Sequence, residues 1–543
     1  MTFEAGLWLV DDSRPQAGSA LLDEWVAQSP GRLRDLQEAA GPSLDIKRRD
    51  TYNSLIHQSL NRQVVIIAML FSSTLFLFAF LPAVVLSYYG LKAVAGQRLR
   101  NALLLSFSYL FYLAGTGEFV LLLIGSTGAD YLLGLLLQRR PKLARLWVGL
   151  SIAVNVGGLA YFKYANFFIA EVNRSLAALG FTTVTLTDIV LPIGISFFTF
   201  QKMSYIIDVY RRHTRAMVNF IDFALYVAMF PQLVAGPIVR FKDIWDQLAY
   251  RRESWEAFYR GALRFCWGLS KKVLIADACG QIADAVFGLD LSLLDTKTAW
   301  LGAMAYTLQI YFDFSAYSDM AIGLARLFGF ELLENFQRPY AALSITEFWR
   351  RWHISLSRWF RDYLYIPLGG NRKGGLRTYA NLLTVFCLCG LWHGANWTFL
   401  VWGLYHGVFL VLERGLGLRA LAADRWVLAR RVLTLAVVIF GWVLFRSESL
   451  SAALDYLQVM VVPRDLALGF DLYRVLNLRN LFFFLVALGT TLGAGHLPTF
   501  EQVMAREGPA RGVLSAVMML VVLPYCSVFI LGGVDHPFIY FRF

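Results

Sequence analysis

The sequence predicts an all-α polytopic membrane protein, and both its composition and its hydropathy pattern lead to that prediction. Hydrophobic residues make up 57% of the 543 residues, whereas charged residues make up only 16%. Soluble domains are about 45–50% apolar and about 25% charged. The apolar residues also gather in long runs, and about 20 in a row are enough to cross a bilayer as a helix. These features exclude a disordered chain, a collagen-like rod and a disulfide scaffold.

The cysteines add no sign of a metal site. They lie in or beside apolar segments, at Cys266, Cys279, Cys387, Cys389 and Cys526. Small buried hydrophobic side chains are the expected role for such positions. Two of them form C-x-C rather than the C-x-x-C of zinc or thiol-redox motifs, so we expect no metal.

Residues 1–68 form a polar N-terminal extension that differs from the rest of the chain. They hold seven Lys+Arg and nine Asp+Glu, a net charge of −2, whereas the remainder carries +14. Met1 is not followed by the pattern of a signal peptide. Two interpretations stay open: a real cytoplasmic or disordered tail, and a start codon assigned too early, with Met69 the true start. The membrane domain is expected over 69–543.

Thirteen segments are candidates for membrane spans. They are 69–90, 101–115, 118–137, 146–163, 186–207, 221–239, 258–276, 298–328, 378–396, 397–415, 427–446, 480–496 and 513–533. Prolines in 186–239 indicate broken or re-entrant segments there, so we expect about eleven true crossings. The loops after the first and third spans are basic and are therefore expected in the cytoplasm. The excess positive charge is explained by this topology rather than by nucleic acid.

Residues 335–377 form a basic stretch inside the apolar chain. Ser344 and Glu347 have the spacing of a capping box, so a helix is expected to start there. One face of that helix carries Trp349, Trp352, Leu356, Trp359 and Tyr363, and the opposite face carries Arg350, Arg351, Arg358 and Arg361. This division is typical of a helix that lies in the membrane interface.

Two interpretations of this helix stay open. In the first it is a membrane-surface helix, and His353 at the edge of its aromatic face is merely packed. In the second it is a polar collar at the cytoplasmic mouth of a cavity, where arginines bind the phosphates of an anionic acyl donor. The glycine-rich turn 369–375 adds Arg372 and Lys373 to that collar, although it lacks the spacing of a P-loop.

The sequence GLWHGANW, residues 390–397, places His393 in or at the end of an apolar span. An ionisable side chain at membrane depth is costly and suggests a functional site. Small neighbours allow backbone or substrate to approach it closely. An imidazole can act as a base or accept an acyl group, and a structural histidine remains the alternative.

Several residues near this histidine are candidates for a tunnel lining or for support. Trp392, Trp397 and Trp402 either line a narrow passage and exclude water, or face lipid or the core. Asn396 lies close to the histidine in sequence, and His406 follows one span later, where a structural or supporting role is expected.

A third stretch, YFDFSAYSDMAIGLARLFGF at 311–330, carries two carboxylates in an apolar segment. Asp313 and Asp319 are six residues apart, about 120° around a helix, so they do not form one acid pair. Buried carboxylates need partners, and the arginines of 335–361 are the expected ones. A proton or cation relay is the alternative use of these two residues.

Together these stretches resemble the membrane-bound O-acyltransferase (MBOAT) family, in particular its branch of bacterial O-acetyltransferases of the alginate type. The matching segments are FSSTLFLFAFLP (71–82), LPIGISFFTFQKMSYIIDVYR (191–211), FPQLVAGPIVR (230–240), 311–330, 335–370, GLWHGANWTFLVWGLYHG (390–407) and PFIYFRF (537–543). The resemblance covers about 70–543 and leaves out the N-terminal extension.

The resemblance implies a ring of about eleven transmembrane helices with re-entrant and interfacial helices around a central funnel. It implies that His393 is the catalytic histidine and that His353 is a second essential position. It further implies that acetyl groups pass from a cytoplasmic donor, acetyl-CoA, across the bacterial inner membrane for O-acetylation of an exopolysaccharide such as alginate. The implied partners are a periplasmic SGNH-type acetyltransferase and proteins of polysaccharide synthesis and secretion, with no bound cofactor.

Two other functions remain as alternatives. A secondary transporter or flippase would depend on Asp313 and Asp319, although no internal repeat is evident. A non-catalytic scaffold of a secretion complex would tolerate replacement of His353 and His393.

Overall fold

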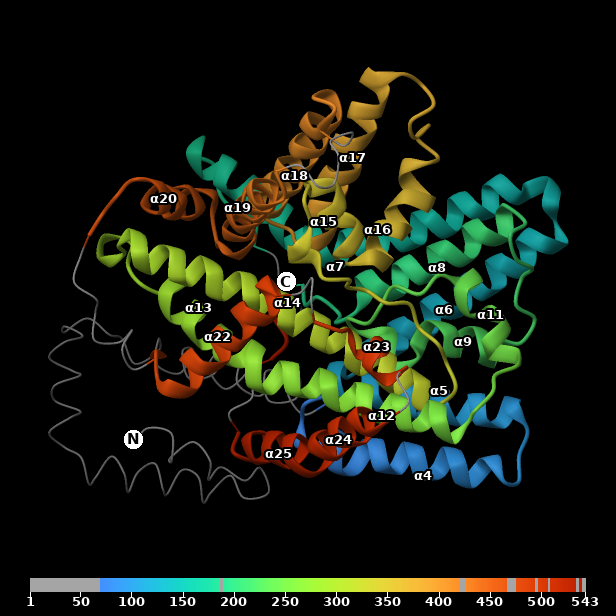
Figure 1. The fold of residues 1–543 in the computed structure, drawn as a ribbon. Helices are drawn as coiled ribbons and strands as arrows, with labels where there is room; N and C mark the ends of the chain where they lie inside the picture. The colour runs from blue at the N-terminus through green and yellow to red at the C-terminus, as the bar shows by residue number, and fades with distance from the viewer. Residues whose placement is uncertain are drawn as a thin grey trace, which may run out of the picture. The chain divides into compact units, whose positions relative to one another are not determined.

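The structure is a computed structural model that describes residues 69–185, 189–418, 426–465, 475–493, 497–505, 508–533 and 537–539. Within these ranges every regular element is a helix, which agrees with the all-α prediction (Figure 1). The N-terminal extension 1–68 lies outside the described residues, so its two interpretations are not tested.

The first group of helices includes long apolar ones. Its members are η1 (Phe76–Phe80), α4 (Leu81–Lys92), α5 (Gln97–Thr116), α6 (Phe119–Arg139), η2 (Pro141–Leu143) and α7 (Ala144–Ala178). Most side chains along α7 remain exposed within the protein, as expected of a helix that meets lipid.

The second group surrounds a central helix, α14. Its members are α8 (Ile195–Tyr210), α9 (Phe220–Ala228), α10 (Phe230–Leu233), α11 (Phe241–Ala249), α12 (Trp255–Ser270), η3 (Lys271–Ala276), α13 (Asp277–Phe287), η4 (Leu291–Leu293), α14 (Thr296–Leu327) and η5 (Pro339–Ala341). The prediction of a broken segment in 221–239 is confirmed, because α9 ends at Ala228 and α10 is a single turn that starts before Pro231.

The third group contains most of the basic stretch 335–377 and the histidine motif at 390–397. Its members are α15 (Ile345–Arg351), α16 (Ile354–Phe360), η6 (Arg361–Tyr365), α17 (Gly375–His393), α18 (Trp397–Gly415), α19 (Val427–Arg446), α20 (Leu450–Val461), α22 (Leu478–Leu492), α23 (Phe500–Met504), α24 (Pro509–Val517), η8 (Met518–Val522) and α25 (Leu523–Leu531). The expected cap is present, since the Ser344 hydroxyl accepts a hydrogen bond from the Glu347 N–H at 3.0 Å.

Two pairs of helices approach each other closely because glycines stand at their crossings. Helix α12 packs along α14, and a methyl group added at Gly268 would lie 2.7 Å from the Ala316 carbonyl oxygen. Helices α17 and α18 meet in the same way, and a methyl group at Gly390 or Gly403 would collide with the backbone of the other helix. Small residues therefore set the distances between the helices that frame the site.

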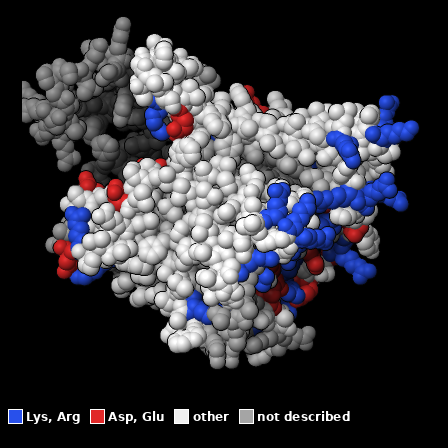
Figure 2. All heavy atoms as spheres, turned by 90° about the horizontal axis from the view of Figure 1, so that it is seen from above, with Lys and Arg blue, Asp and Glu red and all other residues white. Residues whose placement is uncertain are grey.

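Four helical stretches of the described chain are long and apolar enough to cross a membrane. They are Phe119–Arg139, Pro141–Ala178, Val427–Arg446 and Arg511–Leu531, with shorter apolar helices at Phe76–Lys92, Leu450–Val461 and Leu478–Leu492. Other helices, such as α14 with 32 residues, are long but carry buried polar groups. Figure 2 shows a mostly uncharged face with Lys and Arg gathered toward one end, where Figure 1 labels α6, α8 and α11.

Candidate active site

His393 is the last residue of α17 and is only 8% exposed. The helix ends there because Gly394 is extended, with φ −161° and ψ 153°. The imidazole lies among aromatic rings, with its centroid 4.9 Å from Trp392, 5.1 Å from Trp402 and 5.3 Å from Phe445. The predicted histidine at membrane depth is therefore enclosed by apolar surface.

A small cavity opens beside this imidazole. Its volume is about 10 Å³, close to the minimum for a single water molecule. Besides His393 it is lined by Ile310, Phe314, Trp352, Trp402, Trp442, Phe445 and Ile539. Since these side chains are apolar or aromatic, the cavity excludes bulk water from the histidine.

His353 lies between α15 and α16 and is 1% exposed. Its backbone is left-handed, with φ 44° and ψ 55°, which is unusual for a residue with a side chain. The chain on both sides of it pairs with an earlier segment, since the Gln337 N–H donates to Arg351 O and the Ile354 N–H donates to Asn335 O. These bonds replace helical ones and account for the turn at this histidine.

This geometry corrects two predictions about 344–363. The segment is not one continuous helix, because it breaks at His353 into α15 and α16. Its aromatic face does not lie in the membrane interface either: Trp349, Trp352 and Trp359 are all buried and pack against protein. The apolar face that the periodicity predicted is present, but the same periodicity occurs in helices that face a protein core and in helices that lie in the membrane interface.

Hydrogen bonds define the state of the His353 ring. Its Nδ1 lies 3.2 Å from Oδ1 of Asn335, which also accepts from the main-chain N–H and the hydroxyl of Ser355. An oxygen that can only accept assigns the hydrogen to Nδ1, so Nε2 carries the lone pair. Asn335 is fully buried and was not predicted as a site residue.

The two histidines belong to one aromatic cluster. The His353 ring is edge-on to Phe314 at 4.7 Å and its centroid is 6.2 Å from Trp392, which contacts His393. The structure thus brings together the two histidines that were predicted from separate motifs.

The remaining residues near the histidine motif have distinct places. Trp402 lines the small cavity, whereas Trp397 is 46% exposed and donates to Glu171 at 3.2 Å. Asn396 caps α18, accepting from the Thr398 N–H and donating to the Glu448 carbonyl. His406 is fully buried between Trp349 and Trp402, as expected of a structural residue.

Asp313 is buried and binds partners that were not predicted. Its carboxylate lies 2.8 Å from the Lys272 ammonium and accepts a 2.8 Å hydrogen bond from the Ile539 N–H. Lys272 also pairs with Asp277 at 2.7 Å. The expectation that arginines of 335–361 neutralise this carboxylate is wrong, because α12 and η3 pack directly against α14.

Asp319 binds a different set of cations. Its oxygens lie 2.5 Å from the Arg264 guanidinium and 2.5 Å from the Lys271 ammonium. Arg264 also contacts Glu334 at 2.8 Å and Glu501 at 2.9 Å. The arginines of 335–361 are not the partners here either, whereas the prediction that Asp313 and Asp319 do not form one acid pair is confirmed.

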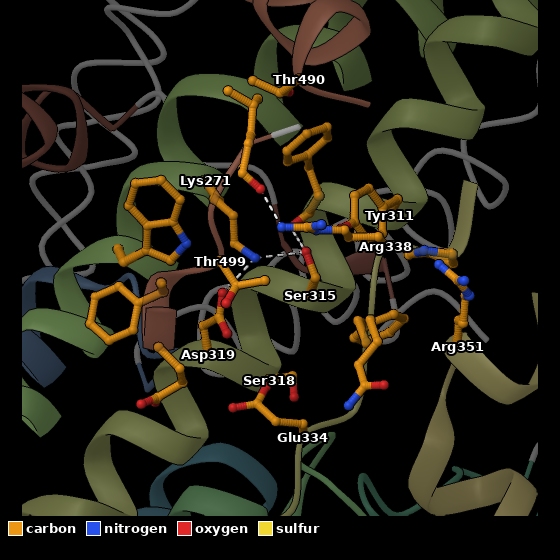
Figure 3. Close-up of a pocket in the computed structure, with 18 of the residues that line it drawn as sticks. Lys271, Tyr311, Ser315, Ser318, Asp319, Glu334, Arg338, Arg351, Thr490 and Thr499 are labelled. Carbon is orange, nitrogen blue, oxygen red and sulfur yellow. Dashed lines mark hydrogen bonds and ion pairs between the residues drawn. The ribbon is translucent and has the colours of Figure 1, made fainter. Parts of the chain in front are cut away.

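A large cavity of about 690 Å³ lies on the Asp319 side of α14 (Figure 3). Figure 3 shows Lys271 bonded to both Ser315 and Asp319, with the Arg338 guanidinium reaching toward them and Arg351 farther away at the edge of the view. This volume falls in the range of about 300–1,000 Å³ that ligand sites occupy.

An aromatic wall separates the large cavity from the small one. Tyr311 and Phe336 line the large cavity, and Trp352 lines the small one. The Trp352 ring lies 6.2 Å from Tyr311 and 5.0 Å from Phe336. Two contacting layers of aromatic side chains therefore stand between the charged cavity and the small cavity beside His393.

The predicted basic collar is divided by the structure. Arg351 lines the large cavity and pairs with Glu347. The other members are exposed and do not line it: Arg350, Arg358, Arg361, Arg372 and Lys373. Arg338 lines the cavity but was not predicted.

Several cations inside predicted spans were also missed, although the sequence held a signal for them. Lys163, Lys271 and Lys272 each interrupt an apolar segment, which is as unusual as a buried histidine. Among the residues that the structure covers, no group of three or more His, Cys, Asp or Glu is placed to hold a metal ion.

Comparisons with known proteins agree with the resemblance. Residues 210–451 match the membrane-bound O-acyltransferase family, MBOAT. The probable alginate O-acetylase AlgI of Pseudomonas aeruginosa is 50% identical over 392 residues, 71% of this chain and 73% of that protein. The peptidoglycan O-acetyltransferase of Helicobacter pylori is 38% identical over 429 residues, 73% and 80%. The teichoic acid D-alanyltransferase of Bacillus subtilis is 27% identical over 278 residues, 47% and 69%.

Proposed function

Because this chain belongs to the membrane-bound O-acyltransferase family and is a multi-pass membrane O-acyltransferase, we propose that it moves acetyl groups from cytoplasmic acetyl-CoA across the bacterial inner membrane. The acetyl groups serve O-acetylation of an exopolysaccharide such as alginate. The observation that carries the proposal is the placement of His393 and His353 in one buried aromatic cluster near a large charged cavity.

The large cavity is the proposed donor site. Glu501 lines this cavity and pairs at 2.9 Å with Arg326 in the last turn of α14. The part of the cavity that Glu501 lines is therefore near the C-terminal end of α14. The same end of α14 is near a basic loop, because the Leu327 carbonyl accepts from Tyr89 just before Lys92. Basic loops face the cytoplasm. This position supports a cytoplasmic opening for the proposed donor site.

Within that cavity, Arg338 and Arg351 are the proposed contacts of the donor phosphates. Arginine suits phosphate because its planar guanidinium forms paired, charge-assisted hydrogen bonds. Arg264 and Lys271 are held by the buried carboxylate of Asp319, so they shape the site rather than bind the donor. Arg351 pairs with Glu347, but both side chains are about one-third exposed, so its guanidinium can exchange that partner for a phosphate. The nucleotide stays outside the bilayer core, and only the pantetheine arm with its thioester passes the aromatic wall.

At the small cavity, His393 is the proposed general base. It removes the proton from an acceptor hydroxyl, whose oxygen attacks the thioester carbonyl carbon. The carbon–sulfur bond breaks as the ester forms, and the coenzyme A thiolate takes the proton from the imidazolium. The apolar lining protects the thioester from water.

The wider arrangement belongs to the same proposal. The acyltransferase domain spans 69–543, with about eleven crossings around a funnel. A periplasmic SGNH-type acetyltransferase and proteins of polysaccharide synthesis or secretion are the proposed partners. A transporter built on Asp313 and Asp319 gains no support, because both carboxylates are held by fixed cations.

The test is acetylation in cells that produce the polymer. A deletion strain complemented with the wild-type gene should restore O-acetyl groups on the polysaccharide, measured by NMR, whereas the His393→Ala gene should not. Immunoblots of the membrane fraction must show equal protein. Acetylation by the His393→Ala strain at the wild-type level would overturn the catalytic role of this residue.

A further inference from the structure

We propose that Lys163 and Tyr164, two neighbouring residues of α7, are positioning residues that hold the helix end carrying His393. The inference deepens the proposed function and rests on it, because it assigns residues to the same site. Neither residue lies in the 210–451 segment that matches the family, and neither lines the small cavity.

The carbonyl groups at the end of α17 take hydrogen bonds from outside that helix. A helix leaves its last four carbonyls without partners inside the helix. In α17 these belong to Gly390, Leu391, Trp392 and His393. The Gly390 oxygen accepts from the Gly394 N–H at 3.3 Å. The oxygens of Leu391, Trp392 and His393 accept from side chains of another helix.

Helix α7 supplies all three donors. The Tyr164 hydroxyl donates to the Leu391 carbonyl at 2.5 Å. The Lys163 ammonium donates to the Trp392 carbonyl at 2.5 Å and to the His393 carbonyl at 3.0 Å. Every main-chain carbonyl at this helix end is therefore bonded, and two adjacent side chains of one helix account for three of the four.

The Lys163 ammonium lies at the C-terminal end of α17, where a positive charge is favourable. A cation at the C-terminal end of a helix is stabilised by the helix dipole, and an ammonium has three donors with which to bridge adjacent carbonyls. The ammonium also lies 5.9 Å from the centroid of the Trp392 ring. Lys163 thus contacts the residue that touches both imidazoles, as well as the main chain of His393 itself.

We call these hydrogen bonds from Lys163 and Tyr164 to the end of α17 the clamp. The clamp matters because His393 is the last residue of that helix. Beyond it the chain is extended at Gly394 before α18 begins, so no further helical turn holds the imidazole in place. The position of the imidazole therefore follows the position of the helix end. Because the small cavity has a volume of only about 10 Å³, a small shift of the imidazole changes what can fit beside it. A shift of about 1 Å at a reacting group can lower a rate by about 100-fold.

The experiment uses the purified full-length protein in nanodiscs with radiolabelled acetyl-CoA and the producing strain's polysaccharide and partner proteins. The variants are Lys163→Met, Tyr164→Phe and the conservative Lys163→Arg. Tyr161→Phe is the matched control, because Tyr161 lies on the same helix and is 56% exposed. The readouts are kcat, KM for acetyl-CoA and hydrogen exchange of the amides of 390–396.

We expect Lys163→Met to lower kcat by about 10- to 100-fold with KM for acetyl-CoA changed less than about twofold. Tyr164→Phe should have a smaller effect in the same direction, since it frees one carbonyl. Lys163→Arg should recover most of kcat because a guanidinium can also bridge two carbonyls. Amides of 390–396 should exchange faster in Lys163→Met and as in the wild type in Tyr161→Phe.

Two results would overturn the clamp. One is wild-type kcat and wild-type exchange in both Lys163→Met and Tyr164→Phe. The other is an equal loss in Lys163→Met and Lys163→Arg together with lowered thermal stability, which indicates general misfolding. If instead the wild-type protein transfers no acetyl group, the proposed function fails, and hydrogen exchange still tests the clamp.

Discussion

The carboxylate of Asp313 binds the main-chain N–H of Ile539, a residue 226 positions later in the chain, at 2.8 Å. The same carboxylate lies 2.8 Å from Lys272, whose ammonium is 4.7 Å from the centroid of the Phe538 ring. Ile539 lines the small cavity beside His393. The Asp313–Lys272 ion pair thus holds a C-terminal segment at the small cavity that His393 lines.

Asp313→Asn should therefore lower acetyl transfer at least tenfold, because the wall formed by Ile539 is no longer fixed by a charged acceptor. Thermal unfolding of the purified protein should report a loss of about 1–3 kcal/mol. Asp277→Asn is the matched control, since Asp277 pairs with the same lysine without contacting Ile539. Equal activity losses in the two variants would contradict this role of Asp313.

Replacing His393 with Gln should reduce kcat by about 10²–10⁴-fold, the usual contribution of a general base. His406→Gln serves as a control for a buried histidine outside the small cavity, and it should keep most of the wild-type rate. Rapid-quench samples of the wild type should contain no acetylated histidine, because a base does not carry the acyl group. Trapped acetyl-His393 would replace the base mechanism with a covalent one.

Asn335→Ala should lower activity by disturbing the orientation and the tautomer of the His353 ring. The Asn335 amide oxygen is the acceptor that assigns the hydrogen of His353 to Nδ1 and also binds Ser355. Its removal leaves buried donors unpaired, which costs about 1–3 kcal/mol of stability, and allows the wrong tautomer. Activity and thermal stability should both fall, whereas a fully active and stable variant would exclude a role for this hydrogen bond.

Arg351→Ala should raise KM for acetyl-CoA by about 10- to 100-fold, since a charge-assisted hydrogen bond contributes about 1.5–3 kcal/mol. Arg350→Ala tests the specificity of this effect, because the neighbouring arginine is exposed and does not line the cavity. Steady-state kinetics at saturating acceptor measures both. An equal change in the two variants would favour a diffuse electrostatic effect over a donor site.

Gly390→Ala should destabilise the protein by about 1–3 kcal/mol, because the added methyl group meets the backbone of α18. Gly375→Ala, in the first turn of the same helix, has open space around it and should be neutral or stabilising. Thermal unfolding of both variants in detergent measures the difference. A neutral Gly390→Ala would show that α17 and α18 can separate at this point.

Much of the molecule could be predicted from local patterns. Hydropathy placed α19 at residues 427–446, and the Ser344–Glu347 spacing placed the start of α15 correctly. Both signals depend on neighbours within a few residues along the chain, so one sequence is enough to find them. His393 was found in the same way, from an ionisable residue among apolar ones.

The amino-acid sequence was enough to predict a helical membrane protein, a histidine within or at the end of an apolar span, and carboxylates that require cations. The identity of these cations, the place of His353 in the same cluster as His393, and the hydrogen bonds from α7 to the end of α17 follow from how the helices pack in three dimensions. Hydrophobic periodicity indicates which face of a helix is apolar, but it does not tell whether that face contacts lipid or other helices. Partners such as Asp313 and Ile539 depend on how distant segments pack, and no local pattern encodes that.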